Sequence, residues 1–384
     1  MKEFLSYGKQ WIDDIDINAV VGVLKGDYLT QGPAVDKFEQ KICELTGAKY
    51  CVAVANGTAA LHIAVQALGI EEGKEGITSP NTFLATCNSL VYNSLKPVFA
   101  DIDNKTYCID PEQLKKKINK NTKVILPVHF AGQPVDMATI YDLCKKNEIH
   151  IIEDAAHAIG SKYKCGSMVG GCKYSDMTIL SFHPVKTITT AEGGAITTNS
   201  DKLYEKLKVL RTHGITKDPK QMTHNPGPWY YEMHELGFNY RLADLQAVLG
   251  TSQLGRLNFF VKRRREIVKQ YNEAFSDVEW LTTPYEDPKV FSAFHLYVLK
   301  VDFNKIGKTR KQVMEELTKK NIGTQVHYIP CHTQPYYQKN FGYKTGDYPV
   351  AENYYEGALS IPLYPKMTDQ DVEWVIKNII GLKN

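Results

Sequence analysis

One lysine of the chain lies where its amino group could act as a nucleophile. Lys186 follows the apolar segment DMTILSF and stands among hydroxyl-bearing and apolar residues in SFHPVKTITTAEGGA, whereas most other lysines belong to solvated runs such as LKKKINKNTK. Removal from water lowers the pKa of an amine and makes its neutral form available for a Schiff base. A surface charge is the ordinary role of a lysine, and it is the surrounding sequence that favours a catalytic one here.

An acidic pair closes another apolar segment. In IIEDAAH, Glu153 and Asp154 end a run of isoleucines, and His157 follows three residues after Asp154. The carboxyl ends of strands are where open α/β sheets bind their ligands. An acid at such a place can hold a cation, a sugar hydroxyl or a protonated ring nitrogen. The alternative is that Asp154 caps a helix and His157 is satisfied locally.

The third candidate is the sequence NGTAALHIA, which directly follows the apolar run CVAVA. Gly57 lets the backbone approach a ligand, the Thr58 hydroxyl can donate a hydrogen bond, and the start of a helix attracts anions such as phosphate. The alternative is an ordinary helix cap by Asn56 or Thr58. The sequence is neither a Gly-Lys-Ser/Thr phosphate loop nor a G-x-G-x-x-G fingerprint, which disfavours nucleoside triphosphate and dinucleotide enzymes.

The three sites share the logic of one cofactor. A phosphate cradle, an acid after a strand and an isolated lysine 32 residues beyond that acid fit pyridoxal phosphate. The lysine would hold the cofactor as a Schiff base, the acid would keep the pyridine nitrogen protonated, and the helix start would hold the phosphate. The ring would then work as an electron sink.

The elements that position these residues are predicted from the hydrophobic pattern. Between about residues 50 and 200, short apolar runs alternate with helical patterns, which indicates a mostly parallel sheet covered on both faces. Helices are expected around 34–46, 111–119 and 136–147. The expected strands are CVAVAN, PVFADI, KVILPVHF, HIIEDAA, DMTILSFH and GGAITTN.

The pattern changes near residue 250. A long helix over 252–275, the strand-like AFHLYVLKV and two further helices around 309–320 and 369–380 predict a smaller α+β domain. We therefore expect a large domain over 1–254 and a small one over 255–384. The stretch 215–235 has no clear periodicity, and its aromatic run Trp229, Tyr230 and Tyr231 favours an ordered loop that makes contacts.

Composition excludes several classes of protein. The 384 residues are 43% hydrophobic and 23% charged, with a formal net charge of +3, which excludes a disordered protein and gives no support to nucleic-acid binding. The eight cysteines form no C-x-x-C pair, so no metal site is indicated and a cytoplasmic protein with reduced thiols is expected. Neither a signal peptide nor an apolar run of 18 residues is visible, so no membrane association is expected.

Motifs along nearly the whole chain resemble those of the DegT/DnrJ/EryC1/StrS sugar aminotransferases, a branch of the fold-type I pyridoxal phosphate enzymes. The motifs are YLTQGPAVDKFE, NGTAALHIA, SPNTFLATCNS, PVFADI, PVHFAGQPVDM, EDAAHAIG, SFHPVKTITTAEGGA, GFNYRLADLQAVLG and HYIPCHTQPYY. The resemblance implies a three-layer α/β fold with a mostly parallel central sheet, a smaller α+β C-terminal domain, and pyridoxal 5′-phosphate as cofactor.

The same resemblance implies roles for individual residues. Lys186 matches the Schiff-base lysine and general base, Asp154 the partner of the pyridine nitrogen, and His157 the contact of the cofactor's phenolic oxygen. Phosphate-binding positions and the aromatic that stacks on the ring, where some relatives carry Trp, are matched by Gly57, Thr58, Ser181 and Phe83.

Four further residues are candidates on the same ground. Asn239 resembles the residue that reaches the phosphate of the neighbouring subunit, with a helix-start turn as the alternative. Arg241, His327 and Tyr328 are weaker candidates for substrate binding, and an ordinary role at a strand end is the alternative for the last two.

Within the family, SFHPVKTITTAEGGA and GPWYYEMHELGFNYRL resemble the transaminases of pseudaminic acid biosynthesis. This implies C4 amination of a UDP-linked 4-keto-6-deoxy-N-acetylhexosamine, L-glutamate as amino donor, and a homodimer with shared active sites. The alternatives are a C3- or C4-aminotransferase for another nucleotide keto-sugar, such as one of the bacillosamine type, and a non-catalytic relative that binds the cofactor or a sugar nucleotide. Lys186 disfavours a dehydratase of the same fold, which carries histidine in its place.

Overall fold

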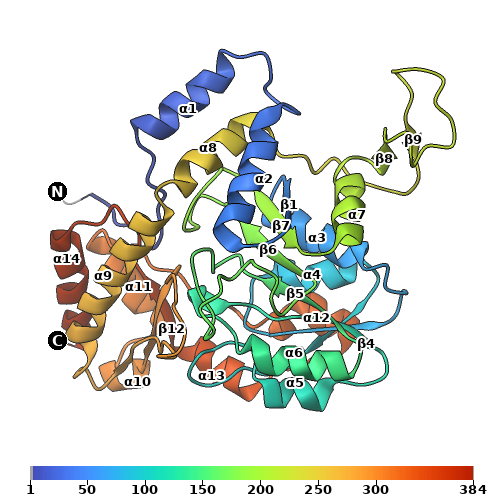
Figure 1. Cartoon of the computed structure of the whole chain (residues 1–384). Coiled ribbons are helices and arrows are strands. Elements are labelled where there is room, and N and C mark those ends of the chain that lie inside the picture. The colour runs from blue at the N-terminus through green and yellow to red at the C-terminus, as the bar shows by residue number, and fades with distance from the viewer. Residues whose placement is uncertain (1–2, 384) are drawn as a thin grey trace.

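A seven-stranded sheet lies at the centre of the computed structural model, which describes residues 3–383 (Figure 1). The strand order is β1-β7-β6-β5-β4-β2-β3, and every neighbouring pair is parallel except those of β7, which runs antiparallel to β1 and β6. The strands are β1 (Tyr50–Val54), β2 (Glu75–Thr78), β3 (Lys96–Phe99), β4 (Thr122–Leu126), β5 (His150–Asp154), β6 (Met177–Ser181) and β7 (Gly194–Thr198). The predicted mostly parallel sheet is confirmed.

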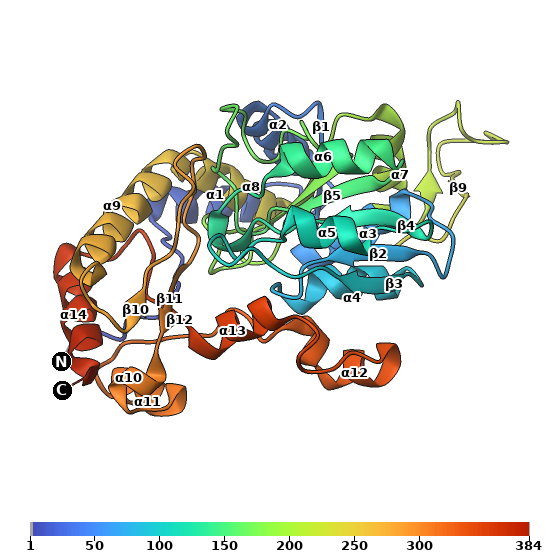
Figure 2. The same cartoon turned by 90° about the horizontal axis from the view of Figure 1, so that it is seen from below.

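Helices cover both faces of this sheet, because successive residues of a strand point to opposite sides. Val52 and Ile152 pack on one side, and Ala53 and Ile151 on the other. The first side is covered by α3 (Gly57–Ala67), α4 (Leu84–Tyr92) and α7 (Asp201–Arg211). The second is covered by α2 (Pro33–Thr46), α5 (Pro111–Lys117), α6 (Met137–Lys146) and α8 (Asp244–Leu254). The three-layer arrangement is therefore confirmed (Figure 2).

A smaller antiparallel sheet lies in the C-terminal part, in the order β10 (Leu281–Thr282), β11 (Tyr297–Val301) and β12 (Ala358–Ile361). Its core is shared with α9 (Leu257–Phe275), α10 (Phe303–Ile306), α11 (Arg310–Lys319) and α14 (Asp369–Ile380). Leu5, from the start of the chain, joins this core, whereas α12 (Pro335–Phe341) and α13 (Pro349–Gly357) pack onto the core of the large sheet. The division at residues 254 and 255 stays a prediction.

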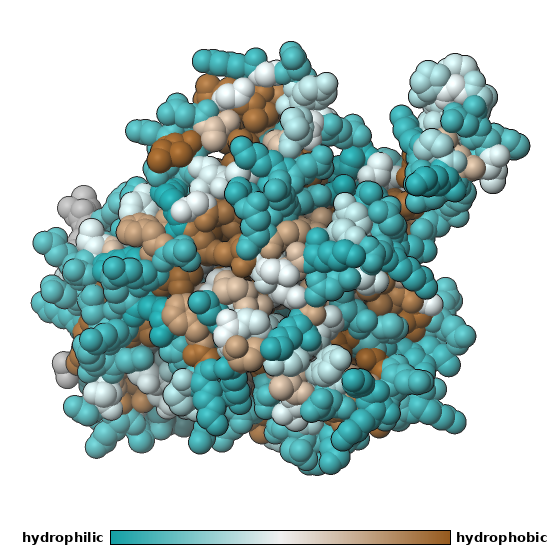
Figure 3. Space-filling model, viewed as in Figure 1, coloured by the Kyte–Doolittle hydropathy of each residue, from teal (hydrophilic) through white to brown (hydrophobic). Residues whose placement is uncertain are grey.

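The helix expected over 252–275 is wrong as a single element. The chain forms α8 and α9 instead, which are separated at Gly255 and Arg256. The pattern also gave no sign of α1 (Asp14–Leu24), whose apolar side chains are not confined to a buried stripe. Ile15, Ile17 and Leu24 of α1 are exposed, and Figure 3 shows hydrophobic surface over this helix.

Residues 213–237 form an arm that projects from the body of the molecule (Figures 1 and 2). Its tip is joined to the body through two short antiparallel strands, β8 (Ile215–Thr216) and β9 (Glu232–Met233). Trp229 is 71% exposed, so most of its ring makes no contact within this chain, and the expected ordered loop that makes contacts stays a prediction. Across residues 3–383, none of the helices has the length and apolarity needed to cross a membrane.

Candidate active site

A cavity of about 850 Å³ opens at the carboxyl ends of β1, β5 and β6. These ends meet at one edge because the three strands point the same way. The predicted site residues that line it are Gly57, Thr58, Phe83, Asp154, His157, Ser181, Lys186, His327 and Tyr328. Asn239 and Arg241 do not line the cavity of this chain, although Tyr240 between them does.

Lys186 stands on the loop that follows β6, where its backbone N–H donates to the carbonyl oxygen of His183 at 2.8 Å. Burial lowers the pKa of its amine from 10.5 to about 8, and the negative charge of Asp154 limits that fall. An amine with such a pKa is partly neutral near pH 7 and can act both as nucleophile and as general base.

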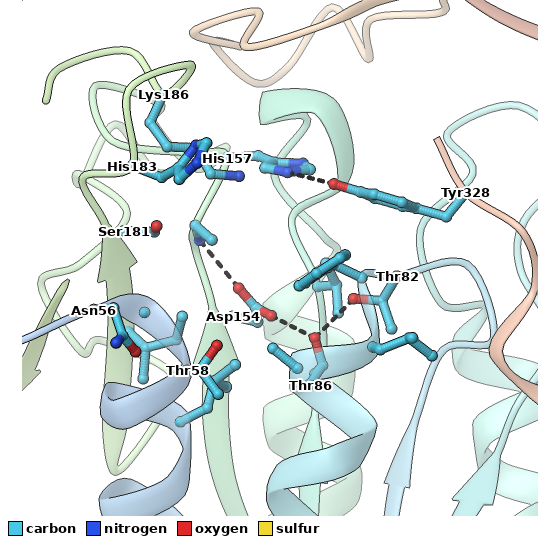
Figure 4. A pocket seen from close by; sticks show the side chains of 18 of the residues that line it. Asn56, Thr58, Thr82, Thr86, Asp154, His157, Ser181, His183, Lys186 and Tyr328 are labelled. Carbon is cyan, nitrogen blue, oxygen red and sulfur yellow. Dashed lines mark hydrogen bonds between the residues drawn. The ribbon is translucent and has the colours of Figure 1, made fainter. Parts of the chain in front are cut away.

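Asp154 ends β5, and its carboxylate is held on two sides (Figure 4). Oδ1 accepts the backbone N–H of Ala156 at 3.1 Å, and Oδ2 accepts the hydroxyl of Thr86 at 2.6 Å. The oxygen of Thr86 is in turn 2.7 Å from that of Thr82. The side chains of Asp154, Thr86 and Thr82 are all buried, so these hydrogen bonds form in a region of low dielectric constant, where they are stronger than in water.

Glu153 points to the opposite face of the sheet, as alternation along β5 requires. Its carboxylate accepts hydrogen bonds from Ser175 at 2.5 Å, from His129 at 2.8 Å and from the Tyr163 hydroxyl. Burial alone would raise the pKa of Glu153, but these hydrogen bonds and His129 outweigh it and hold that pKa below its ordinary value. Glu153 therefore belongs to a buried network away from the cavity.

The start of α3 serves both as a capped helix end and as a wall of the cavity. Asn56 caps the helix, because its Oδ1 accepts the N–H of Ala59 at 2.8 Å. Gly57 and Thr58 then present the first N–H groups, which have no partner inside a helix. A side chain at position 57 would bring its Cβ to 3.0 Å from the Cβ of Ser181 and would crowd that residue, so glycine keeps this cradle open.

His157 is bonded at both ring nitrogens. Nδ1 accepts the backbone N–H of Ala131 at 3.2 Å, and Nε2 lies 3.0 Å from the hydroxyl of Tyr328 (Figure 4). Burial, and then the positive charge of Lys186, lower the pKa of His157 well below its ordinary value. The same causes lower the pKa of His327 to about 3, and its Nδ1 lies 2.7 Å from the Ser360 hydroxyl. Both imidazoles are neutral near pH 7.

Sequence reasoning missed several residues of this cavity. Thr82 and Thr86 could not have been recognised from the sequence, because Thr82 precedes the N-cap of α4 and only the fold brings Thr86, in the first turn of α4, to Asp154. His295 could have been recognised, since it is the single polar residue in the apolar start of AFHLYVLKV. Its ring centroid lies 4.5 Å from that of His157. Nothing in the sequence marks Tyr7 as a residue of the site, because only the fold brings the start of the chain to the cavity.

The cavity fits pyridoxal phosphate by the chemistry of its donors. The glycine cradle at the start of α3 suits a phosphate, because N–H groups and the helix dipole both favour an anion. The clamped carboxylate of Asp154 suits a protonated ring nitrogen, and the amine of Lys186 suits an aldehyde carbon.

Comparison with known proteins agrees with this geometry. Residues 10–380 match the DegT/DnrJ/EryC1/StrS aminotransferase family. Spore coat polysaccharide biosynthesis protein SpsC of Bacillus subtilis is 44% identical over 377 residues, which are 98% of this chain and 96% of SpsC.

Solved structures give the same result. PseC of Helicobacter pylori, an aminotransferase involved in the biosynthesis of pseudaminic acid, superposes with a TM-score of 0.92 at 33% identity, over 99% of both chains. Spr1654 of Streptococcus pneumoniae, described as a sugar aminotransferase and solved in a PLP form, superposes with a TM-score of 0.90 at 29% identity, over 99% of this chain and 98% of the other.

Proposed function

Because the chain belongs to the DegT/DnrJ/EryC1/StrS aminotransferase family and is a pyridoxal phosphate-dependent sugar aminotransferase, we propose that it moves the amino group of L-glutamate to C4 of a UDP-linked 4-keto-6-deoxy-N-acetylhexosamine. The products are 2-oxoglutarate and a 4-amino sugar nucleotide of pseudaminic acid biosynthesis. The likeness to PseC over nearly all of both chains is the observation that carries this choice of sugar. We place the reaction in the cytoplasm, where thiols stay reduced, since all eight cysteines are free.

When bound, pyridoxal phosphate supplies an electron sink for the negative charge that develops at the donor's Cα. Lys186 is the general base that removes the Cα proton of glutamate, and it returns a proton to C4 of the sugar in the second half of the reaction. Its pKa of about 8 suits both directions, since a base works best when its pKa lies near the operating pH.

The remaining predicted residues bind and orient. Asp154 holds a proton at the pyridine nitrogen, and Gly57, Thr58 and Ser181 hold the phosphate at the start of α3. Phe83, which is 60% exposed and lines the cavity, would cover one face of the cofactor's ring.

The wall opposite α3 faces the reacting groups. His157 would lie near the phenolic oxygen of the cofactor, and Tyr328 and His327, which also line the cavity, would form the wall on the sugar side. Both histidines are neutral, so they add no positive charge beside Lys186.

We further propose a homodimer in which each cavity is completed by the partner. Among the described residues that line the cavity none is an arginine, although glutamate carries two carboxylates and a nucleotide sugar carries a diphosphate. Asn239 is exposed and lies outside the cavity of its own chain, beside Arg241. The projecting arm adds exposed apolar side chains, Trp229, Tyr231, Met233 and Leu236, that a second copy would cover.

A second acceptor is favoured by one observation. The 44% identity to SpsC is higher than the 33% identity to PseC, so a nucleotide keto-sugar destined for a surface polysaccharide is the alternative acceptor. Amination at C3, or of a bacillosamine-type sugar, belongs to the same alternative. A non-catalytic relative is disfavoured, because a pure binder has no need of the general base Lys186.

The experiment is a substrate comparison. The protein is incubated with L-glutamate and, in turn, with UDP-4-keto-6-deoxy-N-acetylhexosamines of altro and gluco configuration and with a 3-keto nucleotide sugar. We expect 2-oxoglutarate and a C4-amino product, assigned by NMR, with the altro-configured sugar. Turnover with another sugar alone would replace the proposed acceptor. A cofactor absorption that glutamate leaves unchanged, together with no product from any sugar, would support the non-catalytic alternative.

A further inference from the structure

We propose that Thr86 and Thr82 are positioning residues for Asp154: Thr82 orients the hydroxyl of Thr86, and Thr86 fixes the carboxylate of Asp154 toward the cofactor's ring nitrogen. The inference rests on the proposed role of Asp154 as the partner of that nitrogen. It concerns only side chains of this protein, and neither threonine was among the residues predicted from the sequence.

The direction of both hydrogen bonds follows from the chemistry of the groups. An ionised carboxylate can only accept, so the Thr86 hydroxyl, 2.6 Å from Oδ2 of Asp154, must donate to it. That bond uses the single hydroxyl proton of Thr86. The contact of 2.7 Å between the two threonine oxygens therefore has Thr82 as the donor. The chain of bonds runs from Thr82 through Thr86 to Asp154 and has one possible order.

The start of α4 places the two hydroxyls. Phe83 is the N-cap residue of this helix, and the backbone N–H of Thr86 donates to the carbonyl oxygen of Phe83 at 3.2 Å. Thr86 thus lies in the first turn, where the helix dipole favours a nearby negative charge. Thr82 and Thr86 are 2% and 1% exposed, so water does not compete with them for the carboxylate.

The consequence is a carboxylate whose plane is fixed from two sides. Oδ1 is bonded to the N–H of Ala156 and Oδ2 to Thr86, which leaves the remaining lone pairs for a group in the cavity (Figure 4). Without the Thr86 hydroxyl, the anion loses a hydrogen bond and is free to rotate. Both effects weaken its hold on a protonated ring nitrogen.

The test uses near-isosteric changes in the cofactor-loaded protein. Thr86→Val removes the hydroxyl and keeps the shape, whereas Thr86→Ser keeps the hydroxyl and removes a methyl group. Thr82→Val removes only the outer bond. Thr78→Val is the matched control, because Thr78 is also fully buried but donates its hydroxyl to the carbonyl oxygen of Leu126 at 2.7 Å.

The first readout is the pH midpoint at which the visible absorption of the bound cofactor changes. Asp154→Asn gives the shift expected when the carboxylate is lost, and we expect Thr86→Val to move the midpoint the same way by about 1 to 2 pH units, the effect of one hydrogen bond to a charged group. Thr82→Val should give a smaller shift in that direction, and Thr86→Ser and Thr78→Val should give none.

The second readout separates chemistry from binding. Thr86→Val should lower kcat by about 10-fold or more while KM for glutamate stays within about 2-fold, because the hydroxyl supports the reacting ring and not the donor. Thr86→Ser should restore most of kcat.

Two results would overturn the inference. If Asp154→Asn moves the midpoint and Thr86→Val does not, the threonines only fill space. If Thr86→Ser is as impaired as Thr86→Val, the methyl group matters and the hydroxyl does not. A midpoint that Asp154→Asn leaves unchanged would instead refute the role of Asp154, and with it this part of the proposed function.

Discussion

The hydroxyl of Tyr328 and Nε2 of His157 are 3.0 Å apart, although 171 residues separate the two in the chain. His157 follows β5 of the large sheet, and Tyr328 lies between α11 and α12. Because Nδ1 of His157 accepts the N–H of Ala131, the neutral ring carries its proton on Nε2 and donates it to the Tyr328 oxygen. The proton of Tyr328 itself is thereby left for an acceptor in the cavity.

Tyr328→Phe should therefore lower kcat/KM by about 10-fold, the loss of one hydrogen bond in the transition state. The measurement is steady-state kinetics with the sugar nucleotide and with glutamate varied separately. Tyr343→Phe is the control, since the Tyr343 hydroxyl donates to the carbonyl oxygen of Pro97 and Tyr343 does not line the cavity. Equal effects of the two changes would leave Tyr328 with a structural role only.

The low pKa of Lys186 predicts how fast the cofactor-free protein captures pyridoxal phosphate. Only the neutral amine attacks the aldehyde, so the rate should rise with pH and level off above about 8, whereas an ordinary lysine would continue to gain up to about 10.5. Stopped-flow absorbance at a series of pH values measures this.

Lys186→Ala is the control for that experiment. It should show no such absorbance change and no turnover, yet still bind pyridoxamine phosphate, because the phosphate cradle at Gly57 is intact. Near-normal activity in Lys186→Ala would refute the assignment.

The strands were predictable because parallel strands buried on both faces are continuous runs of Val and Ile, as in β4 and β5. The exception is β2, with the sequence EGIT, which buries Glu75 at its first position through a hydrogen bond from Asn119. The sequence around β2 does not show that Asn119, 44 residues later, will pair with Glu75. The break between α8 and α9 was missed for a related reason, since a single Gly255 is compatible with a continuous helix as well as with a break.

The main residues of the site were predictable because Asp154 ends a strand, Gly57 starts a helix and Lys186 lies on the loop that directly follows a strand. The threonine pair was not, because the bond from Thr86 to Asp154 spans 68 residues and depends on how α4 sits against β5. A motif states which residues are present, whereas such a bond depends on the relative placement of two elements.

Asp154→Asn should reduce transamination by several hundred-fold, or about 3 to 4 kcal/mol, because an amide does not keep the ring nitrogen protonated. Single-turnover kinetics with glutamate measure the step. Glu153→Gln is the internal control: Glu153 faces His129 and Ser175 on the other side of the sheet, so its effect on proton transfer should be small. A larger loss in Glu153→Gln than in Asp154→Asn would mean that the two roles are exchanged.

Glu153→Gln should instead change stability, in a way that depends on pH. The pKa of Glu153 is lower in the folded protein than its ordinary 4.5, so its ionised form stabilises the fold above that pH, and this contribution is lost as the pH falls below about 4.5. We expect the variant to lose about 1 to 3 kcal/mol at pH 7 and the difference to shrink in acid.

Chemical denaturation at pH 7 and pH 4 measures this difference. Glu205→Gln, at an exposed i,i+3 pair with Lys208, should cost less than about 1 kcal/mol at either pH. A constant difference across the two pH values would contradict the role given to the Glu153 charge.

The dimer with shared sites predicts complementation between two inactive variants. Asn239 is exposed in the single chain and comes 53 residues after Lys186, beyond the projecting arm. If Asn239 serves the partner's phosphate, a mixed dimer of Lys186→Ala and Asn239→Ala has one site with both lesions and one with neither. With free exchange half of the dimers are mixed, so about a quarter of wild-type activity should return by this symmetry.

Each variant alone must be strongly impaired, and exchange is checked with differently tagged chains. An active monomer in sedimentation, or a mixture no more active than its parents after proven exchange, would leave Asn239 as a turn residue and each cavity complete within its own chain.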